Sequence, residues 1–221
     1  MAQMLTRFLQ RLQAAGGSAS RTERIRDLFT RAYVLNIWGS AESRSGPGST
    51  LERTAALREE LPKLFAELGV RSVLDIGCGD FNWFRTLDVD VHYTGIDVVD
   101  ELIQENRRRY GRPDRRFEVM EITAQTPPRA DLVFTRDCLV HLENSEIETA
   151  LANIRKSGAT YLLATTFVDR TTNPDIPSGA WRPINLEKPP FSLGPPLRLI
   201  SESQNVEDDR WTDKAMGLWK L

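Results

Sequence analysis

The chain has 221 residues, of which 40% are hydrophobic and 27% are charged, a composition typical of a globular protein with a sizeable core. Its formal net charge is −2 at pH 7, so we expect no general attraction to nucleic acid or to an anionic membrane. Its two cysteines, Cys78 and Cys138, exclude a disulfide framework and favour a reducing, cytoplasmic compartment. No Cys/His grouping has the spacing of zinc ligands, so no metal site is predicted.

Two helices are predicted at the N-terminus. Apolar residues recur at helical spacing over Gln3–Ala14 and over Arg21–Val34, with Thr22 as the expected N-cap of the second helix. Charged residues interrupt the first segment, so it predicts neither a secretory signal nor a membrane span. These helices either cover a sheet face, or form a lid over a cofactor or a homodimer contact.

A loop rich in glycine and serine follows at Asn36–Thr50 and contains Trp38 and Arg44. Such a segment is either a linker or a wall of an active site, since many of its polar groups can point into a site. The tryptophan favours the wall.

The central motif begins at Ser72. Val73, Leu74 and Ile76 are interrupted only by Asp75, which predicts a strand buried on both faces of a parallel sheet. Gly77 and Gly79 then form a turn in which the backbone can bend sharply and approach a ligand. In open α/β sheets, ligands bind beyond the carboxyl ends of the strands.

A second polar signal is Asp97, at the end of a predicted strand His92–Val98 and about 20 residues after Gly77. A carboxylate in this place accepts hydrogen bonds from a ribose diol, which nicotinamide and methionine nucleosides both carry. The third glycine of a dinucleotide fingerprint is missing, because Asn82 stands there.

The remaining pattern predicts alternating helices and strands. The helices are expected at Leu51–Leu68, capped by Ser49 or Thr50, at Trp83–Leu87, at Asp100–Tyr110 and at Ser145–Ile154, and the strands at Arg116–Ile122, Ala130–Asp137, Thr160–Phe167, Leu197–Ser201 and Ala215–Leu221. The arginines between residues 107 and 116 are interspersed with acids and favour a solvated helix end over a phosphate site.

Leu-Asp-Ile-Gly-Cys-Gly at Leu74–Gly79 resembles the first motif of class I S-adenosylmethionine-dependent methyltransferases: two hydrophobic residues, Asp or Glu, a hydrophobic residue, then Gly-x-Gly. The family often has another glycine two residues on, where this chain has Phe81. The resemblance covers residues 51–221. It implies an α/β fold, a Rossmann-like seven-stranded mostly parallel sheet with helices on both faces, and S-adenosyl-L-methionine as cofactor. Residues 1–50 would be an N-terminal helical extension covering the cofactor site.

The resemblance also implies site residues. The cofactor-binding residues would be Asp75, Gly77, Cys78, Gly79, Asp97, Val98, Glu121, Ile122 and Asp137. Asp137 and His141 would lie near the transferable methyl group, with Asp137 the first candidate for a general base and His141 the second. A core histidine is the alternative for His141, and Cys138 is better explained as a small buried residue.

The segment Val168–Pro196 is rich in proline and has no helical period. Loops of this length in a compact domain tend to be functional, so we predict an acceptor-binding wall; a packed structural excursion is the alternative. Its candidate contacts are Asp169, Arg170, Asn173, Trp181, Arg182 and Asn185.

The sequence therefore predicts a methyltransferase acting on a hydroxyl or amine of a small molecule or sugar. The alternatives are a peptide or protein side chain as acceptor, a nicotinamide-dependent oxidoreductase, or an adenine nucleotide-binding regulatory protein without turnover. A nucleobase amino group is disfavoured, because no Asn-Pro-Pro-Tyr or Asp-Pro-Pro-Tyr follows the fourth strand.

Overall fold

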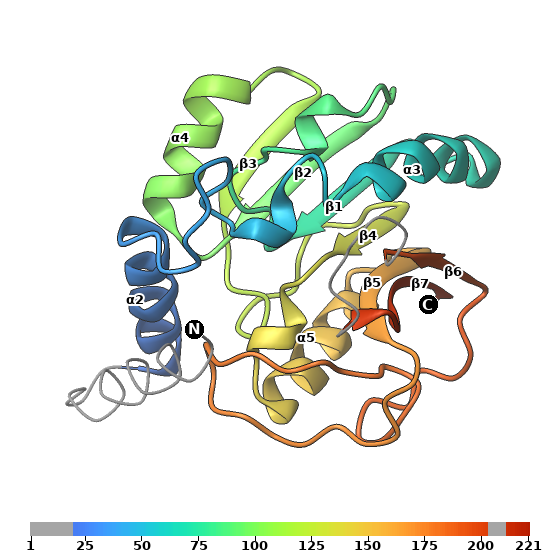
Figure 1. Cartoon of the computed structure of the whole chain (residues 1–221). Helices are drawn as coiled ribbons and strands as arrows, with labels where there is room; N and C mark the ends of the chain where they lie inside the picture. The colour runs from blue at the N-terminus through green and yellow to red at the C-terminus, as the bar shows by residue number, and fades with distance from the viewer. Residues whose placement is uncertain (1–19, 203–210) are drawn as a thin grey trace.

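Seven strands form one mixed sheet in the computed structural model, which describes residues 20–202 and 211–221. The strands are β1 (Ser72–Ile76), β2 (His92–Asp97), β3 (Arg115–Val119), β4 (Leu132–Thr135), β5 (Tyr161–Phe167), β6 (Arg198–Ser201) and β7 (Lys214–Lys220). Their order is β3-β2-β1-β4-β5-β7-β6, and only β7 runs antiparallel to its two neighbours (Figure 1). This confirms the predicted seven-stranded, mostly parallel sheet.

Helices pack on both faces of the sheet. Those of the described residues are α2 (Arg21–Val34), α3 (Ala55–Leu68), α4 (Asp100–Tyr110) and α5 (Asn144–Lys156), with 3₁₀ turns η1 (Pro47–Ser49), η2 (Phe84–Thr86) and η3 (Leu139–His141). α3 and α4 cover one face, whereas α5 covers the other together with the segment 168–196 (Figure 1). The predicted helix Gln3–Ala14 lies outside the described residues, and no helix among those described is long and apolar enough to cross a membrane.

The sheet divides the hydrophobic core in two. In β1, Val73 points into the cluster beneath α3 and α4, while Leu74 and Ile76 belong to the cluster beneath α5. Ile184 and Leu186 of the segment 168–196 are fully buried in the α5 cluster. Much of that segment is therefore a packed excursion, which was the alternative interpretation.

Two helix starts differ from the prediction. Ser20, and not Thr22, caps α2: its hydroxyl accepts from Glu23 N at 3.3 Å, and Glu23 Oε2 accepts from Ser20 N at 2.7 Å, a capping box. α3 begins at Ala55 instead of Leu51, because hydroxyl groups occupy the preceding turn. Thr54 Oγ1 donates to Thr50 O at 2.8 Å.

Three predicted elements are shorter than expected. β3 ends at Val119 and β4 at Thr135, where its pairing with β5 stops. The predicted helix after the glycine turn is only the 3₁₀ turn η2. As a result, Glu121, Ile122 and Asp137 lie in loops beyond the strand ends, free to face a site.

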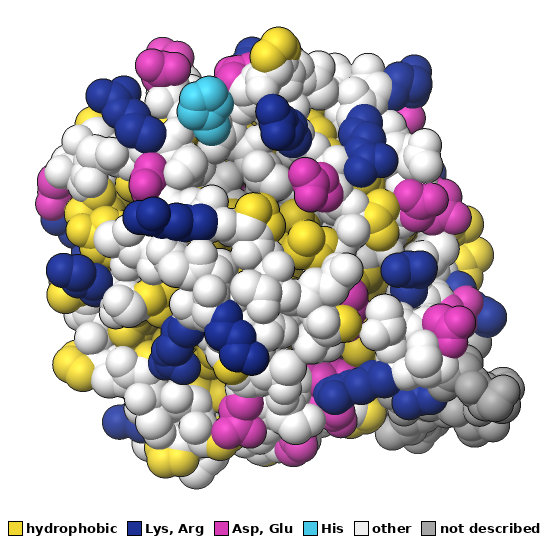
Figure 2. All heavy atoms as spheres, turned by 180° about the vertical axis from the view of Figure 1, so that it is seen from behind, with side chains coloured by type: hydrophobic (Ala, Val, Ile, Leu, Met, Phe, Trp, Pro, Cys, Tyr) yellow, Lys and Arg dark blue, Asp and Glu magenta, His cyan; other side chains and the backbone are white. Residues whose placement is uncertain are grey.

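The arginines at the end of α4 are paired with acids. Arg108 and Arg109 contact Glu105, and Arg112 pairs with Asp114 at 2.9 Å. On the face opposite to that of Figure 1, basic and acidic side chains are intermingled with apolar ones (Figure 2). The solvated interpretation of this cluster is confirmed.

Candidate active site

A cavity of about 470 Å³ opens beyond the carboxyl ends of β1, β2 and β4. Such a volume is usual for small-molecule sites. Its walls come from α2, the loop 36–50, the turn after β1, the loops after β2, β3 and β4, and residues near β5 and β7. Segments far apart in the sequence therefore meet at the edge of the sheet where the site was predicted.

The glycine turn is held against the sheet and the loop 36–50. Gly77 N and Cys78 N both donate to Ile96 O, at 2.9 and 3.1 Å. Gly77 and Gly79 have φ values of 71° and 56°, and a Cβ on Gly79 would lie 2.1 Å from Ser45 Oγ. The glycines are thus required by the protein's own packing as well as by backbone conformation.

Phe81 stands where the methyltransferase motif often has another glycine. Its φ is 58°, a region that bulky residues rarely adopt. Its ring is buried against Phe84, Tyr93, Tyr110 and Phe117, with centroid distances of 4.9 to 5.8 Å. The packing of the Phe81 ring in this aromatic cluster therefore stabilises a backbone conformation that a glycine would adopt without strain.

Asp80 fixes the loop 36–50 on the glycine turn. Its carboxylate accepts from Ser43 Oγ at 3.0 Å, from Arg44 N at 2.7 Å and from Ser45 Oγ at 3.2 Å. Trp38 and Arg44 line the cavity. The loop is a wall of the cavity, as its tryptophan indicated.

Asp97 retains hydrogen-bonding capacity toward the cavity. Its Oδ2 accepts from Gly79 N at 3.2 Å and its Oδ1 from Val99 N at 3.1 Å, which uses about half of the lone pairs of a carboxylate. Burial raises its pKa, against the effect of these backbone donors. The predicted neighbours Val98, Glu121 and Ile122 line the same end of the cavity.

Asp75 lines the cavity, but its carboxyl group is hydrogen-bonded to another residue of the protein. It is buried, and its Oδ2 accepts from the hydroxyl of Tyr93 at 2.6 Å. Burial raises its pKa to about 7, so the carboxyl group is partly protonated at neutral pH. This favours a structural role for Asp75 over the predicted role in cofactor binding.

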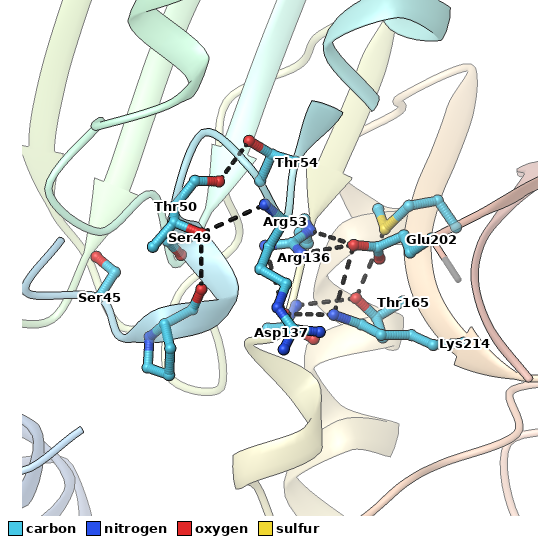
Figure 3. Close-up of polar contacts among 12 residues, drawn as sticks. Ser45, Ser49, Thr50, Arg53, Thr54, Arg136, Asp137, Thr165, Glu202 and Lys214 are labelled. Atoms are coloured by element: carbon cyan, nitrogen blue, oxygen red, sulfur yellow. Dashed lines mark hydrogen bonds and ion pairs between the residues drawn. The ribbon is translucent and has the colours of Figure 1, made fainter. Parts of the chain in front are cut away.

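Asp137 belongs to a buried ionic cluster (Figure 3). Its Oδ2 lies 2.7 Å from Lys214 Nζ and 3.4 Å from Arg136 Nη1, and Arg136 Nη2 lies 2.5 Å from Glu202 Oε2. Burial alone would raise the pKa of Asp137, but Lys214 and Arg136 lower it to about 2. So weak a base is poorly matched to proton removal near pH 7, and the structure argues against Asp137 as the first choice.

The protonation state of His141 suits a general base better than that of Asp137 does. Its Nδ1 lies 2.9 Å from Ala180 O; because a carbonyl only accepts, Nδ1 carries the hydrogen and Nε2 keeps its lone pair. Burial lowers its pKa, so the ring is neutral at pH 7. Phe29 and Trp38 flank the ring at centroid distances of 6.3 and 6.2 Å.

The two cysteines also line the cavity, next to the glycine turn. Burial raises the pKa of Cys138 to about 12 and holds the pKa of Cys78 well above its usual range. Both thiols stay protonated, as expected for buried small residues and not for nucleophiles.

Of the contacts predicted in segment 168–196, only Trp181 lines the cavity. Arg182 is buried and donates to Val140 O and Asn144 Oδ1, and Arg170 pairs with Asp213 at 2.9 Å. Asn173 and Asn185 bond within the segment itself. The structure thus corrects the prediction for Arg170 and Arg182, which contact other parts of the fold through their terminal nitrogens and do not line the cavity; Asp169, Asn173 and Asn185 do not line it either.

Sequence reasoning missed several lining residues. They are Phe29, Tyr33, Arg53, Arg136, Phe167, Glu202, Trp211 and Lys214. No motif marks them, because they come from separate elements that only the fold brings together. Within residues 20–202 and 211–221, no group of three or more His, Cys, Asp or Glu side chains is arranged to hold a metal ion.

The strand order, with β7 inserted antiparallel between β5 and β6, and the cavity at the ends of β1 and β2 define a Rossmann-like α/β protein. A family model described as "Methyltransferase domain" matches residues 73–158. Over these residues the chain is similar to methyltransferase domains. A search of curated protein sequences found no match.

Solved structures share this fold. A magnesium protoporphyrin IX methyltransferase from Synechocystis PCC 6803 with bound S-adenosylmethionine aligns with a TM-score of 0.59 and 14% identity, over 92% of this chain and 98% of that chain. A 1,6-didemethyltoxoflavin-N1-methyltransferase from Burkholderia thailandensis aligns with a TM-score of 0.60 and 18% identity, over 93% and 92%. The N-methyltransferase NodS from Bradyrhizobium japonicum WM9 aligns with a TM-score of 0.56 and 16% identity, over 76% and 96%. At these identities, the likeness concerns the fold.

Proposed function

We propose that the chain binds S-adenosyl-L-methionine in this cavity and transfers its methyl group to a hydroxyl or amine of a small planar acceptor. The observation that carries the proposal is that one cavity joins the glycine turn and Asp97 to an aromatic chamber containing His141. One end has the donors and acceptors of a nucleoside site, and the other suits a flat apolar ligand.

The cofactor would be held by the predicted end of the cavity. The free lone pairs of Asp97 suit the two ribose hydroxyls, and Ile122 and Glu121 would flank the adenine. The cofactor supplies a methyl group on a sulfonium, which is already a good leaving group. What remains for the protein is alignment of the acceptor, exclusion of water and removal of a proton.

The acceptor would lie in the chamber formed by Phe29, Trp38, Phe167, Trp181 and Trp211. Trp181 and Trp211 meet edge to face at 4.6 Å between centroids, a geometry that gives the chamber rigid walls. Two of the similar structures are enzymes whose named substrates, a porphyrin and a toxoflavin precursor, are planar ring systems. These five aromatic side chains favour such a ligand over a sugar or a peptide side chain.

His141 would act as the general base for a hydroxyl acceptor. Its Nε2 carries a lone pair, and among the described residues no hydrogen bond occupies it. The carbonyl of Ala180 fixes the tautomer and would stabilise the imidazolium that forms when the proton is taken up.

Calorimetric titration with S-adenosylhomocysteine, with NADH in parallel, tests the cofactor. Binding of S-adenosylhomocysteine alone supports the proposal, and purified protein with labelled methyl donor can then be screened against phenols, heteroaromatic amines, sugars and peptides. Binding of NADH alone would favour the oxidoreductase, and transfer to peptides alone would refute the planar acceptor.

A further inference from the structure

Arg170 does not line the cavity, yet its side chain contacts a residue of the cavity wall. Its Cζ lies over the ring of Trp211, 5.8 Å from the ring centroid, which is within the range of a cation–π interaction. Trp211 is one of the aromatic residues of the chamber in which the planar acceptor would lie. Arg170 therefore contacts the wall of this chamber from outside it.

The ring of Trp211 is placed by side-chain contacts. Trp181 meets it edge to face at 4.6 Å between centroids, and Phe167 meets it edge to face at 5.9 Å. Phe167 is fully buried at the end of β5, whereas Trp211 lies three residues before β7 begins and takes no part in the sheet pairing. Contacts with the Trp211 ring therefore decide how wide the chamber is on this side.

The Arg170 side chain is itself held in place. Its Nη2 donates to Asp213 Oδ1 at 2.9 Å, and the Asp213 side chain is only 3% exposed. The backbone of Asp213 is fixed as well, because its carbonyl accepts from Val168 N at 3.0 Å, beyond the last residue pair of β5 and β7. The carbonyl of Arg170 accepts from Asn185 Nδ2 at 2.9 Å. The guanidinium group is thus mounted on the rigid end of two paired strands.

The geometry of the ion pair indicates that the indole contact matters. Arg170 Nε and Asp213 Oδ2 are buried, and neither has a hydrogen-bond partner among the described residues. A bidentate pair would use both atoms and would be the stronger arrangement. The guanidinium group instead makes one bond to Asp213 and lies over the ring of Trp211.

We propose that Arg170 is a positioning residue for the methyl acceptor: it holds the Trp211 ring against Trp181 and so sets the width of the aromatic chamber. The inference rests on the proposed function, in which this chamber receives a planar acceptor. Loss of the Arg170 side chain should loosen the chamber and leave the nucleoside end of the cavity unchanged.

Far-ultraviolet circular dichroism reports the placement of the Trp211 ring without any acceptor. The electronic transitions of two indole rings 4.6 Å apart couple and give an exciton couplet, and Trp181→Phe identifies this couplet by abolishing it. Arg170→Gln should reduce the couplet at least about twofold, because the ring loses its cation. Arg170→Lys keeps the positive charge and should retain most of the couplet.

Binding of 2-naphthol, a planar bicyclic phenol, reports the width of the chamber. In calorimetry with S-adenosylhomocysteine already bound, Arg170→Gln should weaken 2-naphthol about two- to fivefold, the range expected for one lost cation–π contact. The affinity for S-adenosylhomocysteine itself should stay unchanged. A general loss of structure would weaken both ligands instead.

Arg198→Gln is the matched control, because Arg198 also pairs with an acid, Glu67 at 2.6 Å, but does not line the cavity. It should leave the couplet and both affinities unchanged. Arg170→Gln leaves the buried carboxylate of Asp213 without its cation, which costs stability. The double variant Arg170→Gln/Asp213→Asn removes both charges, and it should fold and show the same losses.

Two results would refute the positioning role while leaving the proposed function intact: an unchanged couplet in Arg170→Gln and in the double variant, or an unchanged affinity of both for 2-naphthol. An equal loss of affinity for 2-naphthol and S-adenosylhomocysteine would refute it too. Wild-type protein that binds S-adenosylhomocysteine but not 2-naphthol would refute the planar acceptor, and the role of Arg170 with it.

Discussion

Replacing Asp137 by asparagine tests whether the ion pairs of this carboxylate stabilise the fold. The Asp137 carboxylate is three-quarters buried and paired with Lys214 at 2.7 Å. Its pKa falls from 3.8 to about 2 in the folded chain, and each unit corresponds to about 1.4 kcal/mol. Ionisation therefore stabilises the fold by about 2 to 3 kcal/mol at neutral pH, and Asp137→Asn should lose stability of this order.

The sign of the pH dependence follows from linkage. Because the folded pKa lies below the unfolded value, this contribution is fully present above pH 4 or so and is lost as the pH falls toward 2. The difference in free energy of unfolding between wild type and Asp137→Asn should therefore be largest near pH 7 and shrink below pH 4. Urea denaturation followed by circular dichroism at several pH values measures it.

Asp90→Asn is the control, because Asp90 is exposed and forms no ion pair with another described residue. It should change stability by less than about 0.5 kcal/mol. If Asp137→Asn proved as stable as wild type at pH 7, or if its deficit were the same at pH 3, the ion-pair assignment would be wrong.

Three further results are expected. Asp97→Ala should weaken S-adenosylhomocysteine about tenfold to a hundredfold in calorimetry, since charge-assisted bonds contribute about 1.5 to 3 kcal/mol each; an unchanged affinity would remove Asp97 from the ribose site. His141→Gln should lower kcat with a hydroxyl acceptor by about 10²- to 10⁴-fold and keep cofactor affinity. Because burial lowers the pKa of His141, the rate of the wild-type protein should decline only below pH 6.5, the ordinary pKa of histidine. A rate that already declines above pH 6.5 in initial-rate assays would contradict this. Gly79→Ala should destabilise the fold more than Gly69→Ala in thermal unfolding: both glycines have positive φ, but a Cβ at Gly79 meets Ser45 Oγ at 2.1 Å while that at Gly69 meets nothing within 4 Å, and equal losses would show that the Ser45 contact is unimportant.

The sheet was predictable from sequence because its signals are local. Runs such as Val73 to Ile76 and the period of Asp100–Tyr110 fix strand and helix types without reference to the rest of the chain. Helix starts were less predictable where several hydroxyl residues competed: Ser20 and Thr22 both suit an N-cap, and only the pairing with Glu23 distinguishes them.

The nucleoside end of the cavity was also predictable, because its residues follow strand ends at characteristic spacing. The opposite end was not. Glu202, Trp211 and Lys214 follow the fifth strand by more than 30 residues, and their place at the cavity depends on how β7 pairs with β5 and β6. Arg170 and Arg182 misled for a related reason, since their side chains bind Asp213 and Val140 O, which lie outside the proline-rich segment and are brought to it only by the fold.

The position of Lys214 has a consequence for biosynthesis. Its partner Asp137 precedes it by 77 residues, so a nascent chain exposes the glycine turn, Asp97 and Asp137 long before the last strand leaves the ribosome. Until then, Asp137 and Glu202 lack one of their two counter-ions, and β5 lacks its antiparallel neighbour. β7 therefore completes both the sheet and the ionic cluster, and a chain without it would present an open sheet edge prone to aggregation.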